Sequence, residues 1–314
     1  MSRSLQYWKS RRARSRLPRV RNSSKHPKTG ISNIITFKVG MRTAMMIDDS
    51  ESVTKGAEVA RPVTILELPK MEVYGIRTYK KDQNGYNHST YEVYDKQLAE
   101  KLKIKEKKKH EFTEIKNDKS VSAVAVLIVA YPEATSIGQK RRIRFESEVL
   151  GNETSEKMVF AESMLGKEIK PTEIFEEGEY IDVSSITKGK GWQGVIRRGG
   201  VRRNNHKSTQ KVRHGGPLGA FTPGKVFYTI PRAGQQGFGY RTEQNKRILK
   251  ISSNQHASEI NNSAGFKNYG NVKGDFIVLH GSVAGPSKRL IRIKKAIRNS
   301  KKKKIVKPKI LGFS

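Results

Sequence analysis

The sequence predicts a mainly β protein with an α/β insertion and long irregular basic extensions. Short runs rich in β-branched and aromatic residues are separated by Gly- and Pro-containing turns. The pattern between residues 81 and 170 changes to helix–strand–helix. Positive charge is concentrated in segments that hold no carboxylate. Short strands with few helices favour a small closed barrel over an open sheet.

The distribution of charge separates a body from its extensions. The 314 residues include 63 Lys and Arg against 29 Asp and Glu, a formal net charge of +34. Residues 1–30 hold 10 cations, residues 183–242 hold 12 and residues 286–314 hold 12, and none of the three segments holds an acid. A solvated surface normally mixes both signs to limit repulsion. We therefore expect a neutral body with three basic extensions that bind a polyanion.

Seven segments follow from these shifts in composition. They are an N-terminal arm (1–30), a first part of the barrel (31–80), the α/β insertion (81–170), a second part of the barrel (171–189), a Gly-rich central extension (190–242), a third part of the barrel (243–298) and a C-terminal tail (299–314).

Strand-like runs recur through the predicted body. They are Ile34–Ile47, Pro62–Leu68, Val73–Tyr79, Ile174–Ile186, Arg247–Ser252, Asp275–Ser282 and Leu290–Ile297. In the last run Ile291 and Ile293 alternate with Arg292 and Lys294, which predicts a strand with one face in water.

The insertion has a different character from the barrel. Asp95–Lys109 has the composition of a charged helix. Val121–Tyr131 is apolar throughout, so we expect a strand that is covered on both faces. Ser155–Leu165 predicts a second helix with Leu165 facing inward, and Gly166 stands where a helix-terminating glycine belongs.

The central extension has the composition of an RNA-binding loop. It belongs to the segment 183–242, which holds 12 of the 27 glycines and cannot form a long helix or a regular sheet. Aromatic residues alternate with Arg and Lys, which suits phosphates and unstacked bases. We expect this segment to order on binding. The candidate RNA-binding residues in the arm, extension and tail are Arg11, Arg12, Arg14, Arg16, Arg19, Arg21, Lys190, Trp192, Arg197, Arg198, Arg202, Arg203, His206, Lys207, Lys211, Arg213, His214, Phe221, Lys225, Arg232, Gln235, Arg241, Lys301, Lys302, Lys303 and Lys304.

Two glycine-rich motifs resemble cofactor loops but lack the required context. Residues 189–194 match G-x-G-x-x-G, yet no helical period follows and the next acid is Glu243. Residues 219–225 resemble a phosphate-binding loop, but Val226 takes the place of the magnesium-binding hydroxyl and Pro223 lacks an N–H. We expect neither a nucleotide cofactor nor a small-molecule substrate.

Other classes of protein are also disfavoured. The chain has no cysteine, which excludes disulfides and thiolate chemistry. Its seven histidines show no paired metal spacing, and no nucleophile–base arrangement is evident, so we expect no metal site and no catalytic residues. The basic N-terminal segment lacks the apolar core of a secretory signal, although a transit peptide is an alternative. Val121–Tyr131, the longest apolar run, is half the length of a membrane span.

Six motifs in order carry a resemblance to a known family. They are PRVR (18–21), FKVGM (37–41), RPVTILE (61–67), ITKGKGWQGV (186–195), TPGKVFYTIPRAGQQGF (222–238) and RTEQNKRILKI (241–251). Together they resemble the universal large-subunit ribosomal protein family "L three". The helix-containing insertion is similar to the longer archaeal and eukaryotic form of that family.

The resemblance implies a fold, a partner and a location. The fold is a closed six-stranded translation-protein-type β-barrel with an α/β insertion. The chain is a structural, non-enzymatic part of the cytoplasmic ribosome that binds large-subunit (23S-type) rRNA early in assembly and touches neighbouring large-subunit proteins. The central extension reaches toward the peptidyl-transferase region. Phe221 occupies the place near its tip where archaeal and eukaryotic members commonly carry Trp.

Two other functions share some of these features. An architectural DNA- or chromatin-binding protein has similar charge and tails, but the sequence lacks a groove-reading helix or a DNA-binding motif. An RNA-modifying enzyme could use the neutral insertion for catalysis, but no glycine-rich cofactor loop supports it.

Overall fold

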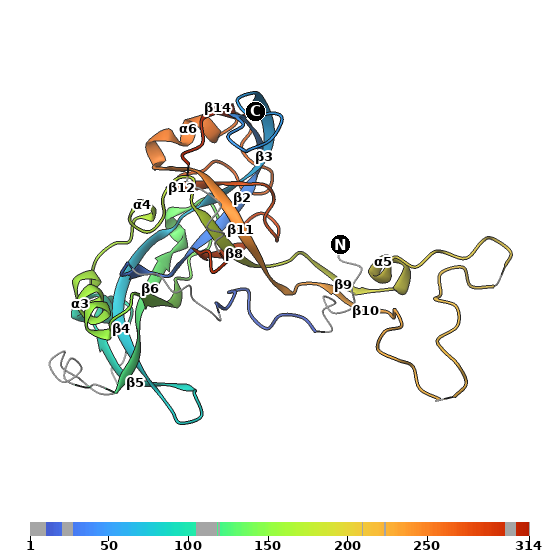
Figure 1. Ribbon diagram of the computed structural model, residues 1–314, viewed down its shortest axis with the longest axis horizontal. Helices are drawn as coiled ribbons and strands as arrows, with labels where there is room; N and C mark the ends of the chain where they lie inside the picture. The colour runs from blue at the N-terminus through green and yellow to red at the C-terminus, as the bar shows by residue number, and fades with distance from the viewer. Residues whose placement is uncertain are drawn as a thin grey trace.

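The computed structural model describes residues 11–20, 28–104, 118, 120–208, 210–222, 224–298 and 306–313. It is mainly β, with few and short helices, as the sequence predicts. Two sheets form a body from which the Gly-rich extension projects far to one side (Figure 1). Within these ranges no helix is both long and apolar enough to cross a membrane.

Six strands pair in a closed ring. Each strand pairs antiparallel with both neighbours in the order β13-β8-β11-β12-β3-β2, and β13 then pairs with β2 to close the ring. The ring strands are β2 (Asn33–Ile47), β3 (Glu58–Glu67), β8 (Tyr180–Ile186), β11 (Tyr240–Ser252), β12 (Phe276–His280) and β13 (Leu290–Lys295). Closure leaves no unpaired edge, since every ring strand finds two partners.

A second, five-stranded antiparallel sheet packs against the ring. Its order is β1-β7-β6-β4-β5, with bounds Gly30–Ile31, Ile143–Leu150, Val121–Tyr131, Lys70–Lys81 and Asn87–Tyr94. The prediction of a buried strand at Val121–Tyr131 is confirmed, and it lies in the middle of this sheet. The prediction that Val73–Tyr79 belongs to the barrel is wrong, because β4 pairs with β5 and β6. Strands β5 and β7 were not predicted.

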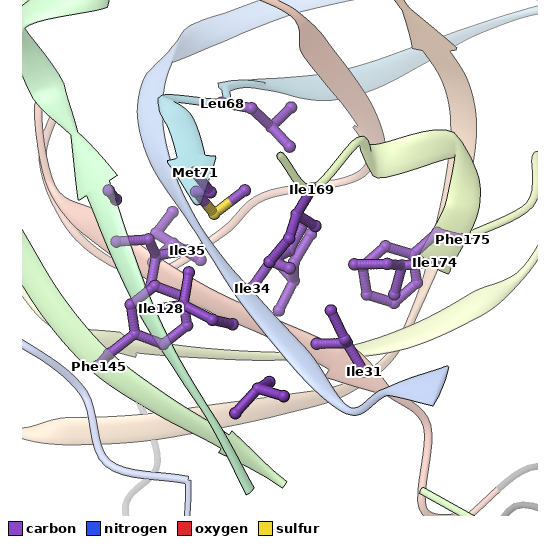
Figure 2. Packing of buried hydrophobic residues seen from close by; sticks show 14 of the residues in the cluster. Ile31, Ile34, Ile35, Leu68, Met71, Ile128, Phe145, Ile169, Ile174 and Phe175 are labelled. Atoms are coloured by element: carbon purple, nitrogen blue, oxygen red, sulfur yellow. The ribbon is translucent and has the colours of Figure 1, made fainter. Parts of the chain in front are cut away.

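One hydrophobic cluster joins the two sheets. Ile34 and Ile35 of β2 are neighbours in sequence yet both fully buried, since one face of the strand meets the ring interior and the other meets the second sheet. Figure 2 shows Ile35 beside Ile128 of β6 and Phe145 of β7. Burying each such side chain contributes roughly 1.5–3 kcal/mol. The ring and the second sheet therefore stabilise each other.

The helices are short, and α1 and α3 pack on the second sheet. In α1 (Lys96–Lys101) the Asp95 carboxylate caps the N-terminus by accepting from the Leu98 N–H at 3.0 Å. The predicted helix Asp95–Lys109 is too long, because α1 ends at Lys101 and Lys103 turns to a φ of 51°; residues 105–109 lie outside the described residues.

The second predicted helix is confirmed. It forms α3 (Thr154–Met164) and packs against β6. Gly166 has the left-handed φ of 75° expected after a helix. Leu165 is only partly buried, at the edge of the core cluster. The other helical turns are α4 (Pro171–Ile174), α6 (Ala257–Ile260), η2 (Pro132–Ala134) and η3 (Asn254–His256).

The prediction that β13 has one wet face is wrong. Arg292 is only 8% exposed and Lys294 only 6%, because the N-terminal arm and the second sheet cover that face. The Arg292 guanidinium donates to Asn33 Oδ1 at 2.9 Å, to the Pro18 carbonyl at 3.3 Å and to the Glu146 carbonyl. It also lies 5.2 Å from the centre of the Phe145 ring. Burial lowers the pKa of Arg292 to about 10.

The C-terminal tail ends as a strand, which the sequence did not predict. Strand β14 (Ile310–Phe313) pairs antiparallel with the distal end of β2, at Ala44–Met46. The Arg247 guanidinium helps to hold the returning chain, since it pairs with the Asp49 carboxylate and donates to the Val306 carbonyl at 2.7 Å.

Replacing Arg292 with Met should lower the free energy of unfolding by about 2 kcal/mol. The substitution keeps an apolar stem but removes the hydrogen bonds to two buried acceptors and one part-buried acceptor. Each buried group left unpaired costs about 1–3 kcal/mol, partly offset by removal of a buried charge. Denaturant unfolding of the full chain measures the loss. Exposed Lys96→Met is the matched control, and equal stability of the two variants would contradict the assigned role.

Candidate nucleic-acid interface

The described part of the arm is extended and presents cations to solvent. It contains no helix or strand over residues 11–20. Its exposed arginines are Arg11, Arg12, Arg14, Arg16 and Arg19. Arg21 lies outside the described residues. The arm is attached to the body, since Leu17 packs against the core cluster and Pro18 is buried.

The central extension begins and ends in a two-stranded hairpin. Strand β9 (Gly189–Gln193) pairs antiparallel with β10 (Gly234–Gly237), which sets Trp192 opposite Gln235. Trp192 is 75% exposed, and Lys190 is exposed beside it. The sequence did not predict either strand, because five residues with two glycines give no strand pattern.

Glycine is required where the hairpin leaves the body. Gly237 has a φ of 72°, and a Cβ built there would lie 2.0 Å from the Lys188 carbonyl oxygen. The next residue, Phe238, donates its N–H to the same carbonyl at 3.2 Å. The bend therefore brings the returning strand close to the outgoing strand in a way that only glycine allows.

A short helix follows the glycine-rich turn, contrary to the sequence prediction. Helix α5 (Val195–Gly199) begins directly after Gly194. It spans five residues, and the strand before it pairs in an antiparallel hairpin, so the parallel strand–helix–strand unit of a dinucleotide site is absent from the described extension. The G-x-G-x-x-G match is therefore still not assigned to a cofactor loop. The reason is now the antiparallel hairpin before the motif's short helix, since a helix does follow the motif.

Arg198 of α5 fixes the returning limb. Its guanidinium donates to the Arg232 carbonyl at 2.8 Å and to the Gln235 carbonyl at 3.2 Å. Gly234 makes room for it, since a Cβ there would lie 2.9 Å from the Arg198 Cζ atom. Arg198 therefore has a structural role in the hairpin. Three of the predicted RNA-binding residues are partly buried, namely Arg198, Gln235 and Arg241.

Beyond α5 the described extension consists of turns and loops. The Asn204 N–H donates to the Val212 carbonyl at 3.1 Å, and the Gly224 N–H donates to the Phe221 carbonyl at 2.9 Å. The exposed predicted residues are Arg197, Arg202, Arg203, His206, Lys207, Lys211, Arg213, His214, Lys225 and Arg232. Phe221 is 99% exposed at a turn. Such a surface has cations and flat apolar faces but no core of its own.

The structure brings further basic residues to the root of the extension. Arg289 lies with its guanidinium 5.3 Å from the centre of the Phe238 ring. Lys38 donates its ammonium to the Val283 carbonyl at 2.5 Å, and burial lowers its pKa. The sequence analysis did not select Arg289, because the long separation from residue 238 hides the contact. Lys301, Lys302, Lys303 and Lys304 lie outside the described residues.

Metal ligation has no support in the described residues. No group of three or more His, Asp or Glu side chains there could hold a metal ion. His206 and His214 are both exposed, and the Nδ1 atom of His214 accepts from the Gly216 N–H at 3.3 Å.

Comparison with known proteins identifies the family. A family model described as Ribosomal protein L3 matches residues 3–312. The chain belongs to the ribosomal protein L3 family. The predicted resemblance is thus confirmed, and with it the prediction of a ribosomal protein that is not an enzyme.

Archaeal relatives in this family match the chain over nearly its whole length. The large ribosomal subunit protein uL3 of Methanopyrus kandleri is 37% identical over 324 residues, which cover 99% of this chain and 89% of the relative. The protein of the same name from Methanothermobacter thermautotrophicus is 37% identical over 299 residues, 92% of this chain and 88% of the relative. The ordered motifs of the arm and extension therefore belong to a chain of the L3 family that is similar to these archaeal uL3 proteins.

Replacing Gly237 with Ala should open the hairpin without unfolding the body. The positive φ and the contact with the Lys188 carbonyl oxygen make the substitution cost more than about 1 kcal/mol locally. Hydrogen exchange at the Phe238 amide should accelerate at least about fivefold, while the melting of the ring stays unchanged. Gly194→Ala is the control, since Gly194 has a φ of −68° and open space around it. Equal exchange in both variants would contradict this account of the bend.

Proposed function

We propose that the chain is a structural constituent of the large ribosomal subunit that binds large-subunit rRNA. The observation that carries the proposal is the exposure of carboxylate-free limbs on a neutral body: the described arm and extension present arginines, lysines and aromatic faces to solvent. The names of the archaeal relatives support membership of the large subunit. Cations that neutralise phosphates would allow rRNA helices to pack closely.

The proposal assigns a task to each segment. The six-stranded ring corresponds to a translation-protein-type barrel and, with the insertion, gives a rigid base. The arm (1–30), the extension (190–242) and the tail (299–314) enter rRNA, while other large-subunit proteins contact the exterior of the body. The extension reaches toward the peptidyl-transferase region. Binding takes place early in assembly of the cytoplasmic ribosome.

RNA fits the extension better than duplex DNA does. Phe221 and Tyr228 are 99% and 88% exposed, and unstacked bases of irregular RNA offer flat partners for such rings. A uniform duplex offers grooves instead, which a recognition helix reads, and α5 has only five residues. The exposed rings and the short α5 therefore disfavour the architectural DNA-binding alternative.

Titration of the full chain on an rRNA 3′-domain fragment tests the proposal. If about ten of the surplus cations meet phosphates, the logarithm of the binding constant should fall against the logarithm of salt concentration with a slope of about −7 to −9. Duplex DNA should compete poorly at about 0.2 M salt. A slope near −2, or equal competition by duplex DNA, would contradict the proposal.

Replacing Phe221 with Ala should affect RNA and leave the body intact. The side chain is 99% exposed, so the free energy of unfolding should change by less than about 0.5 kcal/mol. Loss of a stacked base should cost roughly 1–3 kcal/mol of binding to the rRNA fragment. The variant should still co-sediment with large subunits through a high-salt wash, because the other cations remain. A large drop in melting temperature would show that Phe221 packs within the body.

A further inference from the structure

The described arm is fixed at two points on the body. The Ala13 N–H donates to the Phe238 carbonyl at 2.8 Å, at the root of the extension. Five residues later the Pro18 carbonyl accepts from the buried Arg292 guanidinium. Between these points the Leu17 N–H donates to Ser15 Oγ at 3.1 Å. The chain between residues 13 and 18 therefore follows a defined course beside the β9–β10 hairpin.

A cleft of about 680 Å³ lies between the arm and the hairpin. We call it the arm cleft. The arm lines one side of it and the hairpin lines the other; the lining residues are Arg12, Ala13, Arg14, Arg16, Gly189, Gly191, Gln235 and Phe238. Three of these eight are arginines and none is acidic. The arm therefore places three cations around one space.

The root of the arm cleft is crowded with positive charge. Arg289 lies against the Phe238 ring, and burial, followed by the nearby charge of Arg16, lowers the pKa of Arg289. The buried Nε atom of Arg289 has no hydrogen-bond partner among the described residues. Buried donors are usually satisfied. An anion in the cleft would relieve this repulsion and could accept from the guanidinium groups of Arg12, Arg14 and Arg16, which line the cleft.

The backbone of strand β9 forms part of the opposite wall of the arm cleft. Gly189 and Gly191 are exposed and bring no side chain, and a Cβ built at Gly191 would have no atom within 4 Å. Glycine lets a backbone approach a ligand closely. Gln235 adds a side-chain amide. A volume near 680 Å³ is the size of a site for one drug-sized molecule, so it holds a short piece of one strand and cannot enclose a duplex.

We propose that the arm cleft binds the phosphate backbone of a single unpaired RNA strand, and that the docked arm forms this site before RNA arrives. The inference rests on the proposed rRNA binding and deepens it. Arg12, Arg14 and Arg16 contact successive phosphates, and the Ala13–Phe238 hydrogen bond holds them in register.

The first test removes the three arginines. R12Q/R14Q/R16Q should reduce the magnitude of the salt slope on the rRNA 3′-domain fragment by about 2, because each lost single-strand phosphate contact is worth about 0.7. The charge-matched control K96Q/K140Q/R141Q changes exposed cations of the body and should leave the slope unchanged. If wild-type protein binds but the two triple variants behave alike, the arm cleft is wrong and the proposed function stands. If wild-type protein fails to bind the rRNA fragment, both the arm-cleft proposal and the proposed function are wrong.

The second test keeps every charge and changes only the docking of the arm. Ala13→Pro removes the N–H that donates to Phe238, whereas Ala13→Gly retains it. Ala13→Pro should weaken rRNA binding at least about fivefold relative to Ala13→Gly. Equal binding would overturn the claim that a docked arm forms the site.

The third test identifies the RNA in the cleft. The chain has no cysteine, so Ser15→Cys gives a unique attachment point for an iron chelate that cleaves nearby RNA. Ser15 is exposed between Arg14 and Arg16. We expect the chelate to cleave one unpaired segment of the rRNA fragment. Added wild-type protein should compete for this segment and suppress the cleavage, whereas added R12Q/R14Q/R16Q should suppress the cleavage less. Paired cuts across both strands of a continuous helix would overturn the proposal.

Discussion

Repulsion among like charges constrains the whole molecule. The 63 Lys and Arg residues outnumber the 29 Asp and Glu residues by 34, and this surplus is unevenly distributed along the chain. Acids and cations balance within the body, where pairs such as Asp49 with Arg247 and Glu92 with Arg77 form. Most of the surplus is carried on the arm, the extension and the tail, where distance and solvent reduce repulsion. A smaller part lies in the ring, where Arg292 and Lys294 are buried. The body can therefore fold by itself while the limbs remain available for a polyanion.

The limbs are nevertheless built into the body at their roots. Arg292 joins the arm to both sheets, and Gly237 and Arg198 set the direction of the extension. Arg198 and Arg292 donate to main-chain carbonyls, and Arg292 also donates to the Asn33 amide oxygen, so both cations are held without a carboxylate that would weaken the surrounding positive field. The arm cleft likewise has three arginines and no acid among its lining residues.

Several elements were predictable because local sequence determined them. The strand Val121–Tyr131 is apolar apart from Ser122, and α3 has its helical composition and terminal Gly166. Candidate RNA-binding residues in the arm and extension were identified by composition, and most of those described are exposed as expected. Their individual contacts with RNA remain predictions. Strands β5, β7, β9, β10 and β14 were missed, because short or polar segments become strands only when a partner strand supplies the hydrogen bonds.

The sequence by itself determined the charge separation, the mainly β class and the family, since composition and ordered motifs need no knowledge of distant contacts. Tertiary structure alone decided that β4 leaves the ring for the second sheet, and that Arg292 and Lys294 are buried. It also decided that Ala13 meets Phe238 across 225 residues of chain. The physical reason is that burial and pairing depend on which segments become neighbours in space, and a one-dimensional pattern of polar and apolar residues does not specify those neighbours.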